Sequence, residues 1–227
     1  MLKMMAQSPS SLAMFKTCPA QYKSKYIERT YVDEPSAALE EGKYIHAILD
    51  KGLKGFPVPP GFPSLQRLVD LLLRAKEQGY EVYSEIKLAS TEDRKPCAAF
   101  FSKDAYLRCV IDVLVINQER TKAIVIDWKT GKTRDYKLQE AINTECVLVH
   151  FGYTLEVSTF FAFLKYDEAI TQTVPVGGNR LMTEMREALQ EIHQAHSTGQ
   201  FPPNPSGLCR AWCGNFFCEF NERRQGV

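Results

Sequence analysis

The chain has 227 residues, of which 44% are hydrophobic and 24% charged, so it can bury one sizeable core. Its formal net charge is only +1, which excludes a global positive field for nucleic acid and leaves phosphate binding to local clusters. No apolar run is long enough to cross a membrane, and the first residues lack the apolar core of a signal peptide. We therefore expect a cytoplasmic protein, without a membrane partner, that forms a single domain over residues 1–227.

The N-terminal part, residues 1–79, is predicted to be helical. Ser8 is a good helix cap, and Pro9 suits the first turn that follows it. Leu12 and Phe15 then mark one apolar face, and a basic helical piece continues over residues 20–29. Its positive charge would suit a position near phosphates, although a solvated surface explains the same pattern.

A second helix is expected over residues 36–53 and a third over residues 64–78. The second helix has an apolar stripe formed by Leu39, Gly42, His46, Leu49 and Leu53. A lone histidine on such a stripe is more often a hydrogen-bonded core residue than a ligand. Gly42, one turn before His46, leaves room for something to approach closely. The helix alone therefore leaves both interpretations of His46 open.

Residues 80–176 are predicted to form a sheet core. The pattern predicts strands over residues 80–88, 97–101, 106–117 and 122–129, a helix over 138–150, and a hairpin over 157–165 and 170–176. Glu85 should lie on the polar face of the first strand. A last helix after residue 179 and a cysteine-rich tail complete the chain, in the part from 177 to 227.

The strand over residues 122–129 carries an acid and a lysine two residues apart. Asp127 and Lys129 should stand side by side on one face, while Ile124, Ile126 and Trp128 face a core. A carboxylate can hold a divalent metal, and a lysine can orient a water or steady a developing charge. The pair indicates metal-assisted hydrolysis of a phosphate ester. Alone, D-x-K is a weak signal, because an exposed strand with one ion pair has the same sequence.

The polar connection at residues 118–121 makes the two long strands a hairpin. If the turn centres near residues 119–120, residue i pairs with about residue 239 − i, and Asp112 lies opposite Asp127. Asp112 stands in an apolar run, where an uncompensated carboxylate is costly. Two adjacent carboxylates also repel unless a cation lies between them, and Mg²⁺ or Mn²⁺ takes oxygen ligands. The alternative is a structural ion pair between Asp112 and Lys129.

Seven cysteines in a cytoplasmic chain do not suggest a disulfide framework. Cys209, Cys213 and Cys218 lie close together in the tail and suggest thiolate ligands. A tetrahedral metal or an iron–sulfur cluster normally needs four, and Cys18 is the candidate for the fourth. The alternative is reduced cysteines in a small tail core. The cysteines that look like core thiols are Cys97, Cys109 and Cys146.

Taken in order, these motifs resemble the RecB-like nucleases of the PD-(D/E)XK superfamily. Residues 8–22, Ser-Pro-Ser-Ser-Leu-x-x-Phe-x-x-Cys-Pro-x-x-Tyr, are similar to the opening of those nucleases, and Gly42-x-x-x-His46 is similar to their G-x-x-x-H helix. Ile111-Asp112 and residues 126–132, Ile-Asp-Trp-Lys-Thr-Gly-Lys, resemble their core D…D-x-K-T-G-K. The three tail cysteines look like the end of the AddB-type and CRISPR-adaptation members. The resemblance covers nearly the whole chain.

The resemblance implies an α/β fold of the mixed α+β kind, with a central mixed sheet flanked by helices around a restriction-endonuclease-like core. Lys129 would position the attacking water, Glu85 would serve as an outer ligand, and Gln139 would belong to the family's Q-x-x-x-Y motif. The ligands implied for Mg²⁺ or Mn²⁺ are His46, Asp112, Asp127 and a backbone carbonyl near Trp128.

Two features depart from the family pattern. Gln139 is followed by Asn143 where the family has tyrosine, so Tyr136 or Tyr153 would have to substitute in space. The tail has C-x3-C-x4-C in place of C-x2-C-x5-C. The cysteines that match the [4Fe–4S] ligands of the relatives, which tie the chain ends together, are Cys18, Cys209, Cys213 and Cys218. Zinc or free thiols are the alternatives.

We therefore expect a stand-alone DNA nuclease, an exonuclease that acts on DNA ends or single strands in recombination or repair. Its size suggests a phage or mobile-element enzyme in the host cytoplasm, with a recombination protein as a further partner. The alternatives are a nuclease fold that binds DNA or protein without cleaving, and a structural or redox protein built on the cysteines. Sequence-independent contacts to the DNA backbone are expected from Lys23, Lys25, Lys132, Arg134 and Lys137.

Overall fold

The computed structural model describes residues 4–34, 36–131, 136–164, 168–174 and 180–223. Its centre is a five-stranded sheet whose strands follow one another in chain order. The third and fourth strands are parallel, and the other neighbouring pairs are antiparallel. The strands are β1 (Glu81–Ser90), β2 (Leu107–Ile116), β3 (Lys122–Lys129), β4 (Glu156–Phe163) and β5 (Glu168–Val174). The predicted mixed sheet is confirmed.

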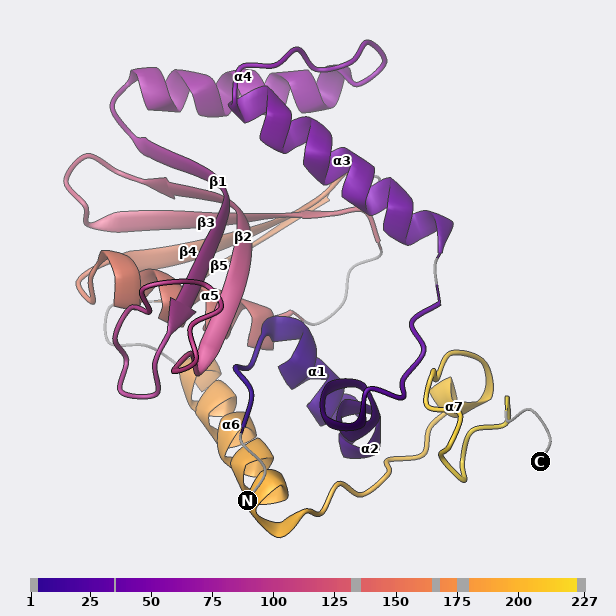
Figure 1. Ribbon diagram of the computed structural model, residues 1–227. Coiled ribbons are helices and arrows are strands. Elements are labelled where there is room, and N and C mark those ends of the chain that lie inside the picture. The colour runs from indigo at the N-terminus through magenta and orange to yellow at the C-terminus, as the bar shows by residue number, and fades with distance from the viewer. Residues whose placement is uncertain (1–3, 35, 132–135, 165–167, 175–179, 224–227) are drawn as a thin grey trace.

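Helices cover both faces of the sheet, so the predicted α+β fold is confirmed as well. On one face, α3 (Ala37–Leu53) and α4 (Pro63–Glu77) pack over a buried cluster that includes Val113 and Trp128. On the other face, α1 (Pro9–Thr17), α5 (Lys137–Phe151) and α6 (Arg180–Thr198) share a larger cluster. Figure 1 shows α3 and α4 above the sheet and the other three helices below it. None of the described helices is long and apolar enough to span a membrane.

The start of α1 follows the sequence prediction. Ser8 and Ser11 form a capping box, in which the Ser11 N–H donates to Ser8 Oγ at 3.2 Å and the Ser8 N–H donates to Ser11 Oγ at 2.8 Å. Pro9 occupies the first turn. Leu12 and Phe15 are buried, as their spacing predicted.

The basic piece predicted over residues 20–29 is helical, but its charges are largely paired. It forms the short helix α2 (Pro19–Tyr22) and the π-helical turn η1 (Lys23–Glu28). The Lys23 ammonium lies 2.9 Å from the Glu28 carboxylate, and the Lys25 ammonium lies 2.5 Å from Asp33. These two lysines are therefore weaker candidates for DNA contacts than the sequence suggested.

Two strand predictions are wrong. Residues 97–101 form turns rather than a strand, because the chain folds back on itself there, with the Ser102 N–H donating to the Ala99 carbonyl at 3.0 Å. Ile124 does not face a core. It is 43% exposed and does not belong to the cluster under α3 and α4, which includes Ile126 and Trp128 of the same strand.

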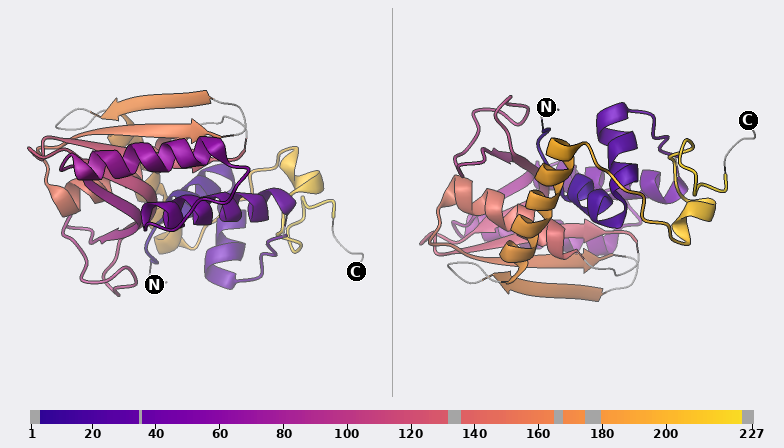
Figure 2. Two further views of the ribbon diagram at one scale, coloured as in Figure 1. Left: turned by 90° about the horizontal axis from the view of Figure 1, so that it is seen from above. Right: turned by 90° about the horizontal axis from the view of Figure 1, so that it is seen from below.

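The C-terminal segment packs against the N-terminal part of the chain beside the sheet. Figure 1 and Figure 2 show the C-terminal segment, drawn in yellow with α7 (Leu208–Ala211), next to the N-terminal helices. The Val32 N–H donates to the Gly214 carbonyl at 3.0 Å, and the Asn204 side chain donates to the Thr17 carbonyl at 2.9 Å. The cysteine-rich tail is thus attached to α1 and to the segment that follows η1.

Candidate active site

β2 and β3 pair in the register that the sequence predicted. Val113 lies opposite Ile126, so Asp112 and Asp127 come next, at the point where the ladder ends. There the Asp112 carboxylate accepts the backbone N–H of Trp128 at 2.8 Å. The acid inside the apolar strand therefore takes the place of a backbone partner of β3.

β1 loses its regular side-chain alternation opposite Asp112. Glu85 has a φ of 48°, a left-handed conformation that costs a non-glycine residue about 1–3 kcal/mol. The ladder contains Ser84 and Ile86 but skips Glu85. As a result two consecutive side chains face α3: Ser84 donates to Asp50 of α3 at 2.8 Å, and Glu85 lines a cleft beside that helix. The predicted alternation of this strand is wrong at this point.

His46 connects α3 to both central strands. Its Nδ1 lies 3.2 Å from Asp112 Oδ1, and its Nε2 lies 3.0 Å from the Trp128 carbonyl oxygen. Because both oxygens act as acceptors, the geometry favours a doubly protonated imidazole. The hydrogen bond to Asp112 raises the pKa of His46 accordingly. A Cβ added at Gly42 would lie 3.2 Å from Thr130 Oγ1, so α3 approaches β3 closely here.

Asp127, Lys129 and Gln139 form a closed triangle at the end of β3. The Lys129 ammonium lies 2.5 Å from Asp127 Oδ2 and donates to Gln139 Oε1 at 2.9 Å. The Gln139 amide donates to the other Asp127 oxygen. Burial, followed by the nearby Asp112 carboxylate, raises the pKa of Asp127 to about 6. The alternative ion pair between Asp112 and Lys129 is not formed.

Tyr136 was not assigned to the site by sequence reasoning, except as one of two substitutes for the family tyrosine. Its ring centroid lies 4.3 Å from Lys129 Nζ, and it stacks on Phe161 at 5.1 Å. Tyr153 instead packs under the Arg94 guanidinium at 4.7 Å. Only Tyr136 reaches the lysine, and its position three residues before Gln139, at the start of the same helix, was the available signal.

All of these groups line or adjoin one cleft of about 850 Å³ between α3 and the ends of the central strands. Among the described residues, the potential metal ligands whose donor atoms all lie within 4.8 Å of one another are His46, Glu85 and Asp112. Glu85, expected as an outer ligand, belongs to this group. Asp127 does not, because Lys129 and Gln139 hold its carboxylate.

Comparison with known proteins decides the family. The model of the PD-(D/E)XK nuclease superfamily matches residues 6–223. The chain belongs to the PD-(D/E)XK nuclease superfamily. No curated protein sequence matches the chain. A solved structure titled "Crystal structure of SSO0001" matches with a TM-score of 0.45 and 13% identity, covering 97% of this chain and 89% of that chain.

Superfamily members use divalent metals such as Mg²⁺ or Mn²⁺, and the donors in the cleft fit such an ion. The carboxylates of Glu85 and Asp112 and the carbonyl of Trp128 are hard oxygen donors, and His46 adds a nitrogen. Burial, and next the Asp112 carboxylate, raises the pKa of Glu85. A cation bound among these groups would offset both the cost of burying the Glu85 charge and its repulsion by Asp112.

Four cysteines from the two chain ends line one small cavity: Cys18, Cys209, Cys213 and Cys218. All of them are free thiols. Two sulfurs accept backbone N–H groups: Cys18 from Asn204 at 3.3 Å, and Cys209 from Ser206 at 3.4 Å. N–H donors of this kind stabilise thiolate ligands.

The four sulfurs are spread more widely than the ligands of one tetrahedral ion. No three of them lie within 4.8 Å of one another. The sulfurs around a zinc ion are only about 3.8 Å apart, as Zn–S bonds of about 2.3 Å require. The sulfurs are therefore spaced more widely than one zinc ion requires, while the cavity between them has a volume of only about 10 Å³. Of the remaining cysteines, Cys109 and Cys146 are buried as predicted, whereas Cys97 is half-buried.

Proposed function

We propose that this protein is a Mg²⁺- or Mn²⁺-dependent DNA nuclease, and that it acts as an exonuclease on DNA ends or single strands in recombination or repair. The observation that supports this most directly is one cleft lined by Asp112 and Lys129, one residue from each half of the D…D-x-K motif. The clustered donors of His46, Glu85 and Asp112 line it together with Lys129.

In this proposal the ligands are Asp112, the Trp128 carbonyl and His46, which has to give up a proton to bind the ion, with Glu85 as a further carboxylate. Asp127 joins them when its carboxylate turns from Lys129 and Gln139 toward the ion. A divalent ion bound there would polarise the phosphodiester and lower the pKa of a water molecule. Hydrogen bonds within the chain hold two of the ligand groups in position. Asp112 fixes the Trp128 peptide through its N–H, so that the carbonyl of the same residue points toward His46.

Lys129 is the residue that we assign to the attacking water. Its ammonium is fixed from three sides, by Asp127, by Gln139 Oε1 and by the ring of Tyr136. A lysine held in this way can orient a water or stabilise the negative charge that develops on the phosphate. Gln139 acts as the positioning residue, since it contacts the acid and the lysine at once.

We further propose that the four tail and N-terminal cysteines hold a [4Fe–4S] cluster that ties the chain ends together. The wide spacing of the sulfurs and their N–H donors support a cluster over zinc. In the same proposal the enzyme is phage-encoded, works in the host cytoplasm and cooperates with a recombination protein. Lys137 remains a candidate for DNA contacts, while Lys132 and Arg134 lie outside the described residues.

The central test is digestion of end-labelled single- and double-stranded DNA with Mg²⁺, with Mn²⁺ and with EDTA. We expect Asp127→Ala and Lys129→Ala each to lower the rate by about a thousandfold or more, because each removes part of the reaction centre. The chain provides a matched control. Asp93 and Lys95 form a second D-x-K ion pair at 2.5 Å, on an exposed loop.

Asp93→Ala and Lys95→Ala should digest DNA at the wild-type rate. Full activity in Asp127→Ala or Lys129→Ala, with the protein folded by circular dichroism, would exclude the site assignment. The position of the label in the products also gives the polarity of digestion.

The second candidate is a nuclease fold that binds DNA without cleaving it. One observation favours it: Asn143, at the place of the family tyrosine, is 1% exposed and cannot contact a substrate. Tyr136 offsets this loss by its contact with Lys129. DNA binding without any metal-dependent cleavage would support the second candidate and reject the first.

A further inference from the structure

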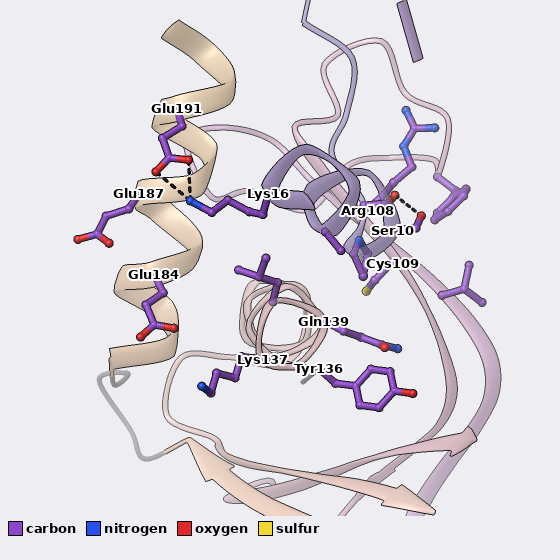
Figure 3. A pocket seen from close by; sticks show the side chains of 16 residues that line it. Ser10, Lys16, Arg108, Cys109, Tyr136, Lys137, Gln139, Glu184, Glu187 and Glu191 are labelled. Atoms are coloured by element: carbon purple, nitrogen blue, oxygen red, sulfur yellow. Dashed lines mark hydrogen bonds and ion pairs between the residues drawn. The ribbon is translucent and has the colours of Figure 1, made fainter. Parts of the chain in front are cut away.

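A second, larger groove lies on the other side of the catalytic residues. It has a volume of about 930 Å³ and runs between α1, β2 and the N-terminal end of α5, with α6 as its far wall. This volume is near the upper end of the range of roughly 300–1,000 Å³ for ligand pockets. Figure 3 shows Tyr136 and Gln139 at one end of the groove and Arg108 and Ser10 at another.

The groove is continuous with the catalytic residues. Tyr136 lines both the groove and the metal-side cleft. Gln139 lines the groove while its amide contacts Asp127 and Lys129. A chain of nucleotides that leaves the reaction centre past Lys129 would therefore enter this groove.

The two walls of the groove carry opposite charge. On the α6 side stand Glu184, Glu187 and Glu191. Glu191 is paired with Lys16 and Glu184 with Arg180, each at 2.7 Å. These carboxylates repel phosphates but accept hydrogen bonds from the amino groups of bases. Away from α6, the positive charge comes from Arg108 on β2 and Lys137 on α5, so a nucleic-acid backbone is favoured on that side of the groove.

The surroundings of Arg108 favour a contact between its guanidinium and a phosphate. Its guanidinium carbon lies 5.6 Å from the ring centroid of Phe100 and 5.3 Å from that of Phe101. Within the part of the chain that the structure describes, Arg108 has no carboxylate partner, and its buried Nε has no acceptor. The Phe100 ring lines the groove, and the adjacent Phe101, outside the lining, is 77% exposed. A cation and open aromatic faces together bind single strands, whose unstacked bases are available for stacking.

Resting on the proposed nuclease function, we propose that the groove between α1, β2 and α5 binds an unpaired DNA strand next to the catalytic centre. Arg108 contacts a phosphate of this strand, and Phe100, which lines the groove, stacks on one of its bases. Duplex DNA exposes no base faces, so the groove selects a single strand.

The test is fluorescence anisotropy with a short labelled oligothymidylate and with a duplex, on the Asp112→Asn background so that the strand is not cut. We expect Arg108→Ala and Phe100→Ala each to weaken single-strand binding about tenfold, as one stacking or phosphate contact predicts. Arg108→Ala should also reduce the slope of log affinity against log salt by about 0.7, the value for one phosphate on a single strand. Duplex binding should change less.

Matched controls lie on the opposite side of the sheet. Arg67 is on α4 and Phe56 is an exposed aromatic residue in the loop before it. Arg67→Ala and Phe56→Ala should bind the strand as the background does. Protection of Arg108, but not Arg67, from phenylglyoxal by the oligothymidylate, read by mass spectrometry, tests the same contact without any substitution in the groove.

The outcomes separate this inference from the proposed function. If the wild-type protein cleaves DNA but the groove variants bind like their controls and Arg108 is not protected, the groove assignment is wrong and the nuclease proposal stands. If the wild-type protein neither binds nor cleaves DNA, both proposals are wrong.

Discussion

At the scale of single residues, the site depends on a few side chains that serve two partners at once. Asp112 accepts from a backbone N–H and faces His46, while Gln139 contacts both Asp127 and Lys129. Such bridging fixes the distance between the acidic cluster and the lysine. Substitution of one of these bridging side chains should therefore also disturb the residues that it contacts.

Tyr136→Ala should lower kcat about tenfold with little change in KM, because it frees the Lys129 ammonium from the ring that covers it. Tyr136→Phe keeps the ring and should retain most of the activity. Steady-state kinetics on a labelled single strand measures both variants. Tyr153→Ala is the control, since that ring contacts Arg94 instead, and an equal loss in this control would contradict the role of Tyr136.

The metal-free protein should lose stability as the pH rises from about 4 to 7. The pKa values of Asp127, Glu85 and His46 are all raised in the folded state, that of Asp127 from 3.8 to about 6. A raised pKa means that the folded state binds protons more tightly than the unfolded state, so its stabilising effect is lost as these groups deprotonate. For Asp127 the loss is at most about 3 kcal/mol.

Urea unfolding in EDTA at several pH values measures this dependence. It should be flatter in Asp127→Asn than in the wild type, and unchanged in Asp104→Asn, an exposed loop position. Mg²⁺ should reverse the slope, because the ion binds the ionised carboxylates. An identical slope in wild type and Asp127→Asn would contradict the assignment.

At the scale of elements, β1 and β2 are irregular where they form the site. The left-handed Glu85 turns two consecutive side chains toward α3 and leaves the ladder open opposite Asp112. Regular strands would bury one of these acids between α5 and the sheet. The irregularity thus places both carboxylates on the side from which α3 supplies His46.

Glu85→Gly should be more stable than Glu85→Ala by about 1 kcal/mol, because glycine adopts positive φ without strain. Lys87, two residues later in the same strand, is the control, and there glycine should be less stable than alanine by about 0.5–1 kcal/mol. Denaturant unfolding of the four variants gives both differences. The same order at both positions would show that the backbone of Glu85 is not strained.

At the scale of the whole molecule, the chain ends lie on the same side of the sheet and share the four-cysteine cavity. The tail is also attached to the N-terminal part by the Val32–Gly214 backbone hydrogen bond, the ion pair of Arg223 with Glu34 and side-chain hydrogen bonds such as that of Asn204 to Thr17. A bound cluster would add to the stability that these contacts give this region.

Cys18→Ser should remove iron from anaerobically purified protein, abolish its visible absorbance and lower Tm by at least about 5 °C. Cys97→Ser should change none of these quantities, since Cys97 lies outside the cavity. Iron content, absorbance and thermal unfolding are measured on both variants. A wild-type preparation that is colourless and free of iron would exclude the cluster.

Much of this protein was determined by local sequence. Periodicity and caps predicted the helices and the long strands, and the length of one turn fixed the register that brings Asp112 to Asp127. These features depend on interactions between residues near in the chain, which a sequence displays directly. The D-x-K pair and the four cysteines were visible for the same reason.

Only the tertiary structure decided which of the candidate site residues contact one another. It assigned Lys129 to Asp127 rather than to Asp112, brought Glu85 into the ligand group and chose Tyr136 over Tyr153. Each of these arrangements depends on contacts between segments distant in the chain or on the positive φ of one residue. Neither of these produces a periodic pattern in the sequence. The groove beside Arg108 could not be predicted from the sequence either, since its walls come from four separate elements.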